Sequence, residues 1–563
     1  MKWWMSVAAV TILGCFSPLW GADSVVAVAT VTDGAALTRQ VLDFAEVSGS
    51  DKIKAGAYGW KVFTEQPCFT EAIDMSRPAG VVAWLPEGER SPRGFWILPV
   101  KSGKALQKML PGNWQVECTE DGLTKITVKK GETFQRVFYA AEYDSWLILA
   151  EQPSHFPVHW TSRQIDEAKR NFEELAQSRD LGVTLYVNRL PVEIRREVFT
   201  RWNQGIRKCL EKNRSKWGEE LSASLLEKMD RLMQKAEASH YSSPVETLSW
   251  NLIWEENADM LKMRLEATAA AGSSLGEKWN AFAKPVSTVL GKFGSSEEMF
   301  SSQVSMKLSF LASPEVQLLA ERYGEQWLRK MRAQTVSPEV AETVEKFVRE
   351  NADSWKKAFL APNWEEAFQI VLSRENLLVM WGRAVPDSAV LEKQFQQIVN
   401  FVKEQETDAL REKVVESGKE VEGEWRIYYA DFALPENSTC PHLPWLRSVC
   451  GTSIQGCVVF APQTVYYAIG KNAKADLLAF LKSDAARPTA VPALRWNLSL
   501  RQLLEWTALH GHHKHARFQA ENALKKMGEV GDGAVSVELV PVENGLGIEM
   551  LWTPSAIRML KGI

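Results

Sequence analysis

Residues 248–267 read LSWNLIWEENADMLKMRLEA, and this stretch decides the class of fold. Leu248, Trp250 and Leu252 stand at alternate positions, and the alternation resumes at Leu261 after a polar turn. Successive side chains of a strand point to opposite faces of a sheet, so the pattern predicts a β-hairpin. A strand that alternates apolar with polar residues belongs to an antiparallel sheet with one face in water.

Further strand patterns lie on both sides of this hairpin. The ones before it are at 25–31, 80–85, 94–100, 114–118, 126–128, 137–141 and 146–150. The ones after it are at 377–381, 425–430, 458–461 and 465–469, and Asn544-Gly545 between two alternating runs predicts a tight hairpin turn. Strands mixed with short helices indicate an α+β fold.

Helical periodicity dominates between 161 and about 240. Val198, Trp202, Ile206 and Leu210 recur every three or four residues, which predicts an apolar stripe buried against another element. Asp387 introduces a second long helix. The order of elements in 95–110 matches that in 378–395, and the hairpin at 137–150 resembles the one at 458–470. The predicted fold is therefore α+β, with two related antiparallel sheet-and-helix blocks joined by long amphipathic helices.

These elements predict five segments along the 563 residues. They are a signal peptide at 1–22, a first α+β block at 23–160, a helical segment at 161–242, a β-hairpin and helical segment at 243–362, and a second α+β block at 363–563.

Several short passages resemble an uncharacterised family of exported proteins from planctomycete-type bacteria, related to domains of unknown function. The passages are Ser76-Arg77-Pro78-Ala79-Gly80 before a strand, Asp180-Leu181-Gly182-Val183 leading to Leu190-Pro191 and Arg195, Gly272-Ser273-Ser274-Leu275, and Asn544-Gly545-Leu546. The resemblance implies a secreted or periplasmic location. It implies no activity, cofactor or catalytic residue.

The N-terminus has the layout of a secretory signal. Lys2 precedes a short apolar run that ends before Pro18, and the small residues Gly21 and Ala22 predict cleavage before Asp23. Alternatively, Ile12-Leu13-Gly14-Cys15 is a lipoprotein cleavage box, in which case Cys15 carries a lipid anchor. The run is too short to span a bilayer. We therefore expect a periplasmic or cell-surface protein.

Export permits disulfides among the remaining cysteines. One bridge is expected within Cys440, Cys450 and Cys457, and Cys68–Cys118 is the other candidate pair. Cys209 lies in a helical pattern and is expected to be a buried thiol.

Composition and charge narrow the classes of function. The chain has 45% hydrophobic and 24% charged residues and a net charge of −4, which argues against a disordered chain, a collagen-like repeat and a polybasic nucleic-acid tail. No P-loop, dinucleotide-binding glycine turn, zinc-protease or EF-hand motif occurs. We therefore predict no cofactor and no nucleic-acid partner.

Residues 272–276, Gly-Ser-Ser-Leu-Gly, match the nucleophile elbow of serine hydrolases, which would make Ser274 the nucleophile. A nucleophile elbow follows a strand buried on both faces, whereas Lys262, Arg264 and Glu266 alternate with apolar residues in the strand before this turn. Capping of the following helix by Ser273 or Ser274 explains the same residues.

The histidine cluster HGHHKH comprises His510, His512, His513 and His515. On a helix its members form pairs three residues apart that could share a metal ion. No acidic or cysteine ligand lies within the cluster, so weak surface affinity for metal is the competing interpretation.

A basic stretch contains Arg195, Arg196, Arg201, Arg207, Lys208, Lys212, Arg214 and Lys216. It could contact an anionic envelope polymer or lipid headgroups, or it could simply be the solvated face of a helix.

The chain contains 23 tryptophans, three of them in the signal segment. Most of the others fall at positions that periodicity assigns to the core. Trp250 and Trp254 are the exception, because a one-sided sheet could present them to a ligand.

The function that these features predict is that of an exported, non-catalytic binding or scaffold protein. Its expected partners are an envelope polymer, a lipid or another exported protein. The alternatives are an exported serine hydrolase using Ser274 with a histidine of the 510–515 cluster, and a metal or lipid carrier.

Overall fold

The computed structural model describes 24–31, 71–85, 93–101, 115–120, 123–130, 134–143, 145–156, 172–173, 181–190, 192–214, 219–238, 245–255, 260–271, 273–285, 288, 290–293, 299–307, 363–372, 377–404, 414–434, 436, 443–483, 491–511, 513–528 and 533–559, with single positions 33, 34, 39, 42, 58, 61, 65, 325, 342, 345, 346 and 349. The chain divides into two compact units. The first comprises Met1–Trp202, Lys235–Asn280 and Pro541–Ile563, and the second comprises Asn203–Gln234 and Ala281–Val540.

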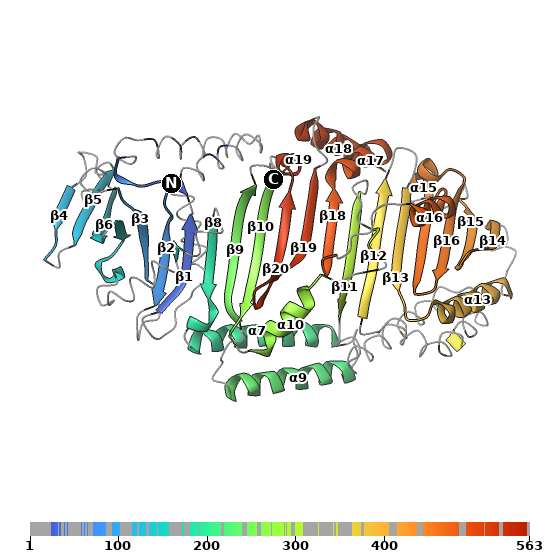
Figure 1. Cartoon of the computed structure of the whole chain (residues 1–563), viewed down its shortest axis with the longest axis horizontal. Helices are drawn as coiled ribbons and strands as arrows, with labels where there is room; N and C mark the ends of the chain where they lie inside the picture. Colours follow the sequence, from blue (N-terminus) through green and yellow to red (C-terminus); the bar gives the residue numbers. More distant parts are fainter. Residues whose placement is uncertain are drawn as a thin grey trace. The chain divides into compact units, whose positions relative to one another are not determined.

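The first unit is built on antiparallel strands (Figure 1). They are β1 (Ser24–Val31), β2 (Ala79–Leu85), β3 (Arg93–Pro99), β4 (Gln115–Cys118), β5 (Thr124–Lys130), β6 (Phe134–Tyr143), β7 (Trp146–Ala150), β8 (Leu181–Tyr186), β9 (Val245–Glu255), β10 (Met260–Ala269) and β20 (Gly545–Trp552). Hydrogen bonding arranges them in the order β4-β5-β6-β7-β3-β2-β1-β8-β9-β10-β20.

The second unit contains nine of the described strands. They are β11 (Phe300–Lys307), β12 (Asn363–Leu372), β13 (Leu377–Ala384), β14 (Val414–Glu422), β15 (Trp425–Ala433), β16 (Ser453–Ala461), β17 (Thr464–Gly470), β18 (Leu494–Ser499) and β19 (Ala534–Val542). Their order is β14-β15-β16-β17-β13-β12-β11-β18-β19, all antiparallel. The order in which β1 to β9 pair in the first unit recurs in β11 to β19.

Nine α-helices lie within the described residues. They are α7 (Val192–Lys212), α9 (Glu219–Ala238), α10 (Ser274–Ala283), α13 (Ser388–Glu404), α15 (Leu443–Cys450), α16 (Ala473–Lys482), α17 (Leu500–His510), α18 (Lys514–Met527) and α19 (Pro554–Met559). Two short 3-10 helices, Pro153–His155 and Val187–Arg189, follow β7 and β8. Local capping supports the predicted start of α13, since Asp387 Oδ1 accepts a hydrogen bond from the Ala389 amide at 2.8 Å.

Each unit buries its own apolar core. In the first, Val82, Phe95 and Ile148 from three strands pack with Phe172, and all are at most 4% exposed. In the second, Met380, Val459 and Leu477 belong to one cluster, with Leu477 contributed by α16. Residues Ala473, Leu477 and Leu481 recur every four positions of α16, so one face of this helix is buried.

The predicted fold class is wrong. Antiparallel strands dominate the part of the chain that the structure describes, with 20 strands beside nine α-helices. They do not form two sheet-and-helix blocks joined by long helices. Two segments that were expected to be mainly helical contain strands with a neighbour on each side. Strand β8 pairs with β1 and β9, and strand β11 pairs with β12 and β18. Periodicity showed each element's apolar face but could not show which strand pairs with which.

The individual hairpins agree better with the sequence. The pairing of β9 with β10 confirms the predicted hairpin, with Leu265 opposite Trp250 and Ala267 opposite Leu248. Asn544, between β19 and β20, has a φ of 51°, the left-handed conformation that a two-residue turn requires. The signal segment and Cys15 lie outside the described residues.

Two predictions about α7 are wrong. The predicted buried stripe includes Val198 and Trp202, but these side chains are 60% and 50% exposed. Cys209, expected to be buried, is also exposed. The buried positions of α7 are Ile194, Asn203 and Leu210. Leu210 belongs to the predicted stripe, so the prediction is confirmed at that position and wrong at Val198 and Trp202.

The described cysteines are free thiols. Cys450 and Cys457 are buried, whereas Cys118 and Cys209 are exposed. A bridge between Cys450 and Cys457 is therefore absent, and Cys68 and Cys440 lie outside the described residues.

Candidate functional site

Ser274 is the first residue of α10 and belongs to the first unit. The strand before it, β10, has charged side chains on one face: Lys262 pairs with Glu549 of β20 at 2.9 Å, and Arg264 pairs with Glu266 at 2.7 Å. A strand with this charged face is unlike the buried strand that precedes a nucleophile elbow. Ser273 directly precedes α10, but its buried hydroxyl has no hydrogen-bond partner in the described part of the chain, so capping by Ser273 is not seen.

The histidines belong to the second unit. His510 is the last residue of α17, with its ring 5.3 Å from that of Trp506, and His513 is the residue before α18. His515 is in the first turn of α18, and His512 lies outside the described residues. No group of three metal-binding side chains forms among the residues that were placed. Neither unit contains both Ser274 and a histidine of this cluster.

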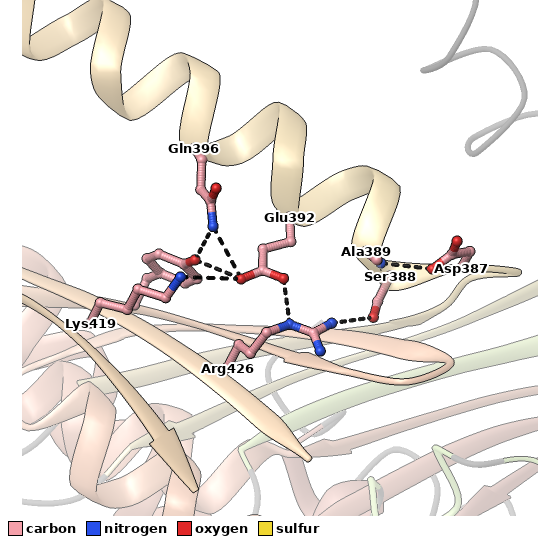
Figure 2. Close-up of polar contacts among 8 residues, drawn as sticks. Asp387, Ser388, Ala389, Glu392, Gln396, Lys419 and Arg426 are labelled. Carbon is pink, nitrogen blue, oxygen red and sulfur yellow. Dashed lines mark hydrogen bonds and ion pairs between the residues drawn. The ribbon is translucent and has the colours of Figure 1, made fainter. Parts of the chain in front are cut away.

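A polar cluster in the second unit centres on Glu392, which α13 directs toward Arg426 and Lys419 (Figure 2). Lys419 lies on β14, and Arg426 and Tyr428 lie on β15. These two strands pair with Lys419 opposite Tyr428, and Tyr428 and Arg426 are two residues apart. Side chains two residues apart in a strand share a face, so all three strand residues lie on the face that meets α13.

The Glu392 carboxylate accepts from several donors. Its Oε1 atom accepts from the Tyr428 hydroxyl at 2.6 Å and from Gln396 Nε2 at 3.2 Å, with Lys419 Nζ at 3.7 Å. Its Oε2 atom pairs with Arg426 Nε, and Arg426 also donates to the Ser388 hydroxyl at 3.3 Å. Since Glu392 is only 7% exposed, these contacts replace the water that the carboxylate loses on burial.

The half-exposed side of the cluster carries the positive charge of Lys419. The hydrogen bond to Tyr428 is the largest cause of a raised pKa at Lys419, and the charge of Glu392 acts in the same direction. The Lys419 side chain is half exposed, and its ammonium also lies 5.0 Å from the centre of the Tyr428 ring.

This arrangement anchors α13 on the β14–β15 hairpin. Both oxygens of Glu392 are engaged by side chains of α13, β14 and β15, so the carboxylate joins these three elements. The sequence offered no way to select Glu392 among 70 acidic residues. Its partner Tyr428 is 36 positions away and becomes a neighbour only through the sheet.

A second feature, in the first unit, is the distribution of polarity over β8, β9 and β10. On one face, Leu248 and Leu265 are 46% and 41% exposed. On the other face, Ser249 and Asn251 are 7% and 2% exposed, and Thr184 of β8 is 2% exposed. The polar face is therefore the covered one, and the apolar face is the open one.

Hydrogen bonds satisfy part of the covered polar face, although the buried Asn251 Oδ1 has no hydrogen-bond partner within the described residues. The hydroxyls of Thr184 and Ser249 lie 3.0 Å apart, and Asn251 Nδ2 donates to Glu266 at 3.3 Å. The ion pairs of β10 lie on the same face, because Lys262, Arg264 and Glu266 alternate with the apolar residues. Polar groups that are satisfied in this way can be buried at little cost.

The open apolar face continues across neighbouring strands through the register. Leu265 of β10 stands opposite Trp250 of β9 and Ile548 of β20. On β8 the face is covered, because Val183, opposite Trp250, packs against a buried cluster that includes Leu190 and Ile194. Trp250 itself is partly exposed. We name the face carrying Leu248, Trp250, Leu265 and Ile548 the open apolar face. The sequence predicted its side chains but not that they would be the exposed ones, and the side chain of Trp254 lies outside what the structure describes.

Within the residues that were placed, none of the helices combines the length and apolar character needed to cross a membrane. Comparison with known proteins found no matching family model, no matching curated protein and no matching solved structure.

Proposed function

We propose that this protein is an exported, non-catalytic binding protein that holds an apolar surface of another exported protein against the open apolar face. One observation carries the proposal: Leu248 and Leu265 are exposed while Ser249 and Asn251, on the opposite face of the same hairpin, are buried. Apolar side chains gathered on an open face, with polar ones covered, are typical of an interaction surface.

The chemistry of the face favours a protein partner. It is a sheet surface with aliphatic and aromatic side chains in neighbouring strands, because Leu265 stands between Trp250 and Ile548. Protein interfaces combine an apolar centre with enrichment in aromatic residues. Covering the exposed parts of Leu248 and Leu265 would contribute about 1 kcal/mol each, or roughly 30-fold in affinity together. The expectation of export rests on the signal-like N-terminus.

Site-specific photo-crosslinking in the host tests the proposal. A photoreactive amino acid at position 265 should form a crosslink to a discrete protein. The matched control is position 116, because Val116 on β4 is 46% exposed, like Leu248, but lies elsewhere in the unit. Leu248→Ser should weaken the crosslink formed from position 265 about fivefold, since the two residues lie on the same face and Leu248 contributes about 1 kcal/mol.

Three results would contradict the proposal. They are equal crosslinking from positions 265 and 116, a crosslink of undiminished yield in Leu248→Ser, and a crosslinked product that is a lipid instead of a protein. Mass spectrometry of the crosslinked product separates the last result from the first two.

A further inference from the structure

Helix α7 presents an exposed apolar row that begins at Val198, four residues after the buried Ile194. Val198, Trp202, Gly205 and Cys209 follow the spacing i, i+4, i+7 and i+11, so they lie on one face of the helix. Val198 and Trp202 are 60% and 50% exposed, and Cys209 is exposed. A methyl group added to Gly205 would meet no atom within 4 Å. The row therefore faces open space.

A row of cations runs beside it. Arg201, Lys208 and Lys212 are spaced i, i+7 and i+11, and all three are exposed. At 100° per residue this row lies less than a quarter turn from the row of Val198 and Trp202. The helix carries six basic and three acidic residues, a net charge of +3, whereas the whole chain has a net charge of −4.

Two of the cations of α7 form ion pairs with acidic side chains of the protein. Arg201 pairs with Glu197 on the same helix, and Arg207 pairs with Asp230 of α9. The Arg201 side chain remains 70% exposed despite its pair. Surface pairs of this kind are weak and do not prevent a cation from meeting a stronger anionic partner.

We infer that α7 lies along the surface of an anionic phospholipid bilayer, with Val198 and Trp202 at the level of the acyl chain boundary and Arg201, Lys208 and Lys212 against the phosphates. Helices that lie in this interface combine an apolar strip containing Trp with flanking Lys and Arg. Phe199, whose ring centroid is 5.6 Å from that of Trp202, widens the apolar strip. The helix is about 31 Å long, so it can lie flat on the membrane.

The positive charge of α7 favours binding to an anionic bilayer over binding to a neutral one. Since the chain as a whole is acidic, attraction to an anionic bilayer must come from this local patch. Each Lys or Arg near such a surface contributes about a fivefold increase in partitioning. A soluble anionic polymer would be held by the cations alone, whereas a bilayer also takes up the Trp202 side chain.

Flotation of the full chain with vesicles tests the inference. Vesicles of phosphatidylcholine with phosphatidylglycerol should carry the protein upward, and vesicles of phosphatidylcholine alone should not. Trp202→Ser should weaken binding several-fold, and replacing Lys208 and Lys212 with Gln should weaken it about 25-fold. The matched controls are Trp496→Ser, at a tryptophan that is 47% exposed on β18, and Gln at Lys525 and Lys526, which are exposed on α18. Both controls should bind like the unaltered chain.

A fluorescence measurement places the contact without altering Trp202. An environment-sensitive dye on Cys209, with the other cysteines replaced by Ser, should shift to shorter wavelength when the anionic vesicles are added. The same dye on Cys118, which is exposed on β4, should not shift. A circular dichroism spectrum like that of the unaltered chain establishes that the labelled variants are folded.

Four outcomes would overturn the inference. They are failure to float with either vesicle, equal weakening by Trp496→Ser and Trp202→Ser, an unchanged dye spectrum at Cys209, and binding that the lysine replacements abolish but Trp202→Ser leaves intact. The last would indicate a purely ionic contact, as with an anionic polymer.

Discussion

The hydroxyl of Tyr428 donates a hydrogen bond of 2.6 Å to Glu392, and this contact joins strand β15 to helix α13. The same carboxylate pairs with Arg426, so one buried acidic side chain links the helix to two residues of the strand. Removing a partner from such a cluster leaves a buried charge or donor without its counterpart, which costs more than the lost contact itself.

Replacing Glu392 with Leu should destabilise the second unit by about 2 to 3 kcal/mol, because Arg426 would lose its carboxylate. Tyr428→Phe should cost about 1 kcal/mol. Urea unfolding measures both values. Glu436→Gln is the control, since Glu436 is 79% exposed in its pair with Arg447 and should change stability by less than about 0.5 kcal/mol. Equal losses at Glu436 and Glu392 would contradict the anchoring role.

The four described cysteines should differ sharply in reactivity. Burial raises the pKa of Cys457 to about 12 and also raises the pKa of Cys450, so neither thiol is ionised near neutral pH. Cys118 and Cys209 are exposed and should react with a thiol reagent in the folded protein. Mass spectrometry after brief alkylation at neutral pH locates the modified residues. Rapid modification of Cys457 would show that its surroundings are open.

Cys457 should also make stability depend on alkaline pH. Its pKa is higher in the folded chain than in the unfolded chain, so its stabilising effect is complete below about pH 9 and is lost as pH rises toward 12. At about pH 10.5 the loss is on the order of 2 kcal/mol. Urea unfolding at pH 8 and pH 10.5 should show a smaller decline in Cys457→Ala than in the unaltered chain. Identical declines would refute the contribution of this thiol.

His155 should make the stability of the protein decline at acidic pH, whereas Cys457 does so at alkaline pH. Burial, followed by the nearby charge of Arg93, lowers the pKa of His155 in the folded chain. A lowered pKa favours the neutral ring, so its contribution to stability is complete above about pH 6.5 and is lost as pH falls below that value. His155→Gln should therefore flatten the decline in stability between about pH 6.5 and pH 5, measured by urea unfolding. A steeper decline in the variant would contradict this direction.

Two glycines should respond oppositely to replacement by Ala. In Gly80→Ala the new methyl group would lie 2.6 Å from Phe172 Cε2 and closer still to the carbonyl oxygen of Ala29, so we expect a loss of about 1 to 3 kcal/mol. In Gly205→Ala the methyl group meets open space within a helix, so stability should rise by about 1 kcal/mol. Thermal unfolding of both variants shows whether the melting temperature falls in Gly80→Ala and rises in Gly205→Ala. Destabilisation by Gly205→Ala would show that α7 is covered at this point.

Local signals in the sequence predicted the hairpins. Alternation over 248–267 and the Asn544-Gly545 dipeptide each act over a few residues, and the pairing of β9 with β10 and the φ of Asn544 agree with them. In contrast, β8 was missed because Leu181–Tyr186 is six residues long and lies within a stretch of helical periodicity. Its partners, β1 and β9, come from distant parts of the chain.

The sequence by itself determined where the hairpins turn and which residues of β9 share a face, because these follow from backbone geometry over neighbouring positions. Only the tertiary structure decided which face is covered. Alternation is symmetrical between the two faces, so it cannot distinguish buried Ser249 from exposed Leu248. Likewise, Glu392 meets Arg426 and Tyr428 because α13 packs on the β14–β15 hairpin. Contacts between residues far apart in the sequence depend on how the helices and strands pack together, and a pattern over a few neighbouring residues does not specify that packing.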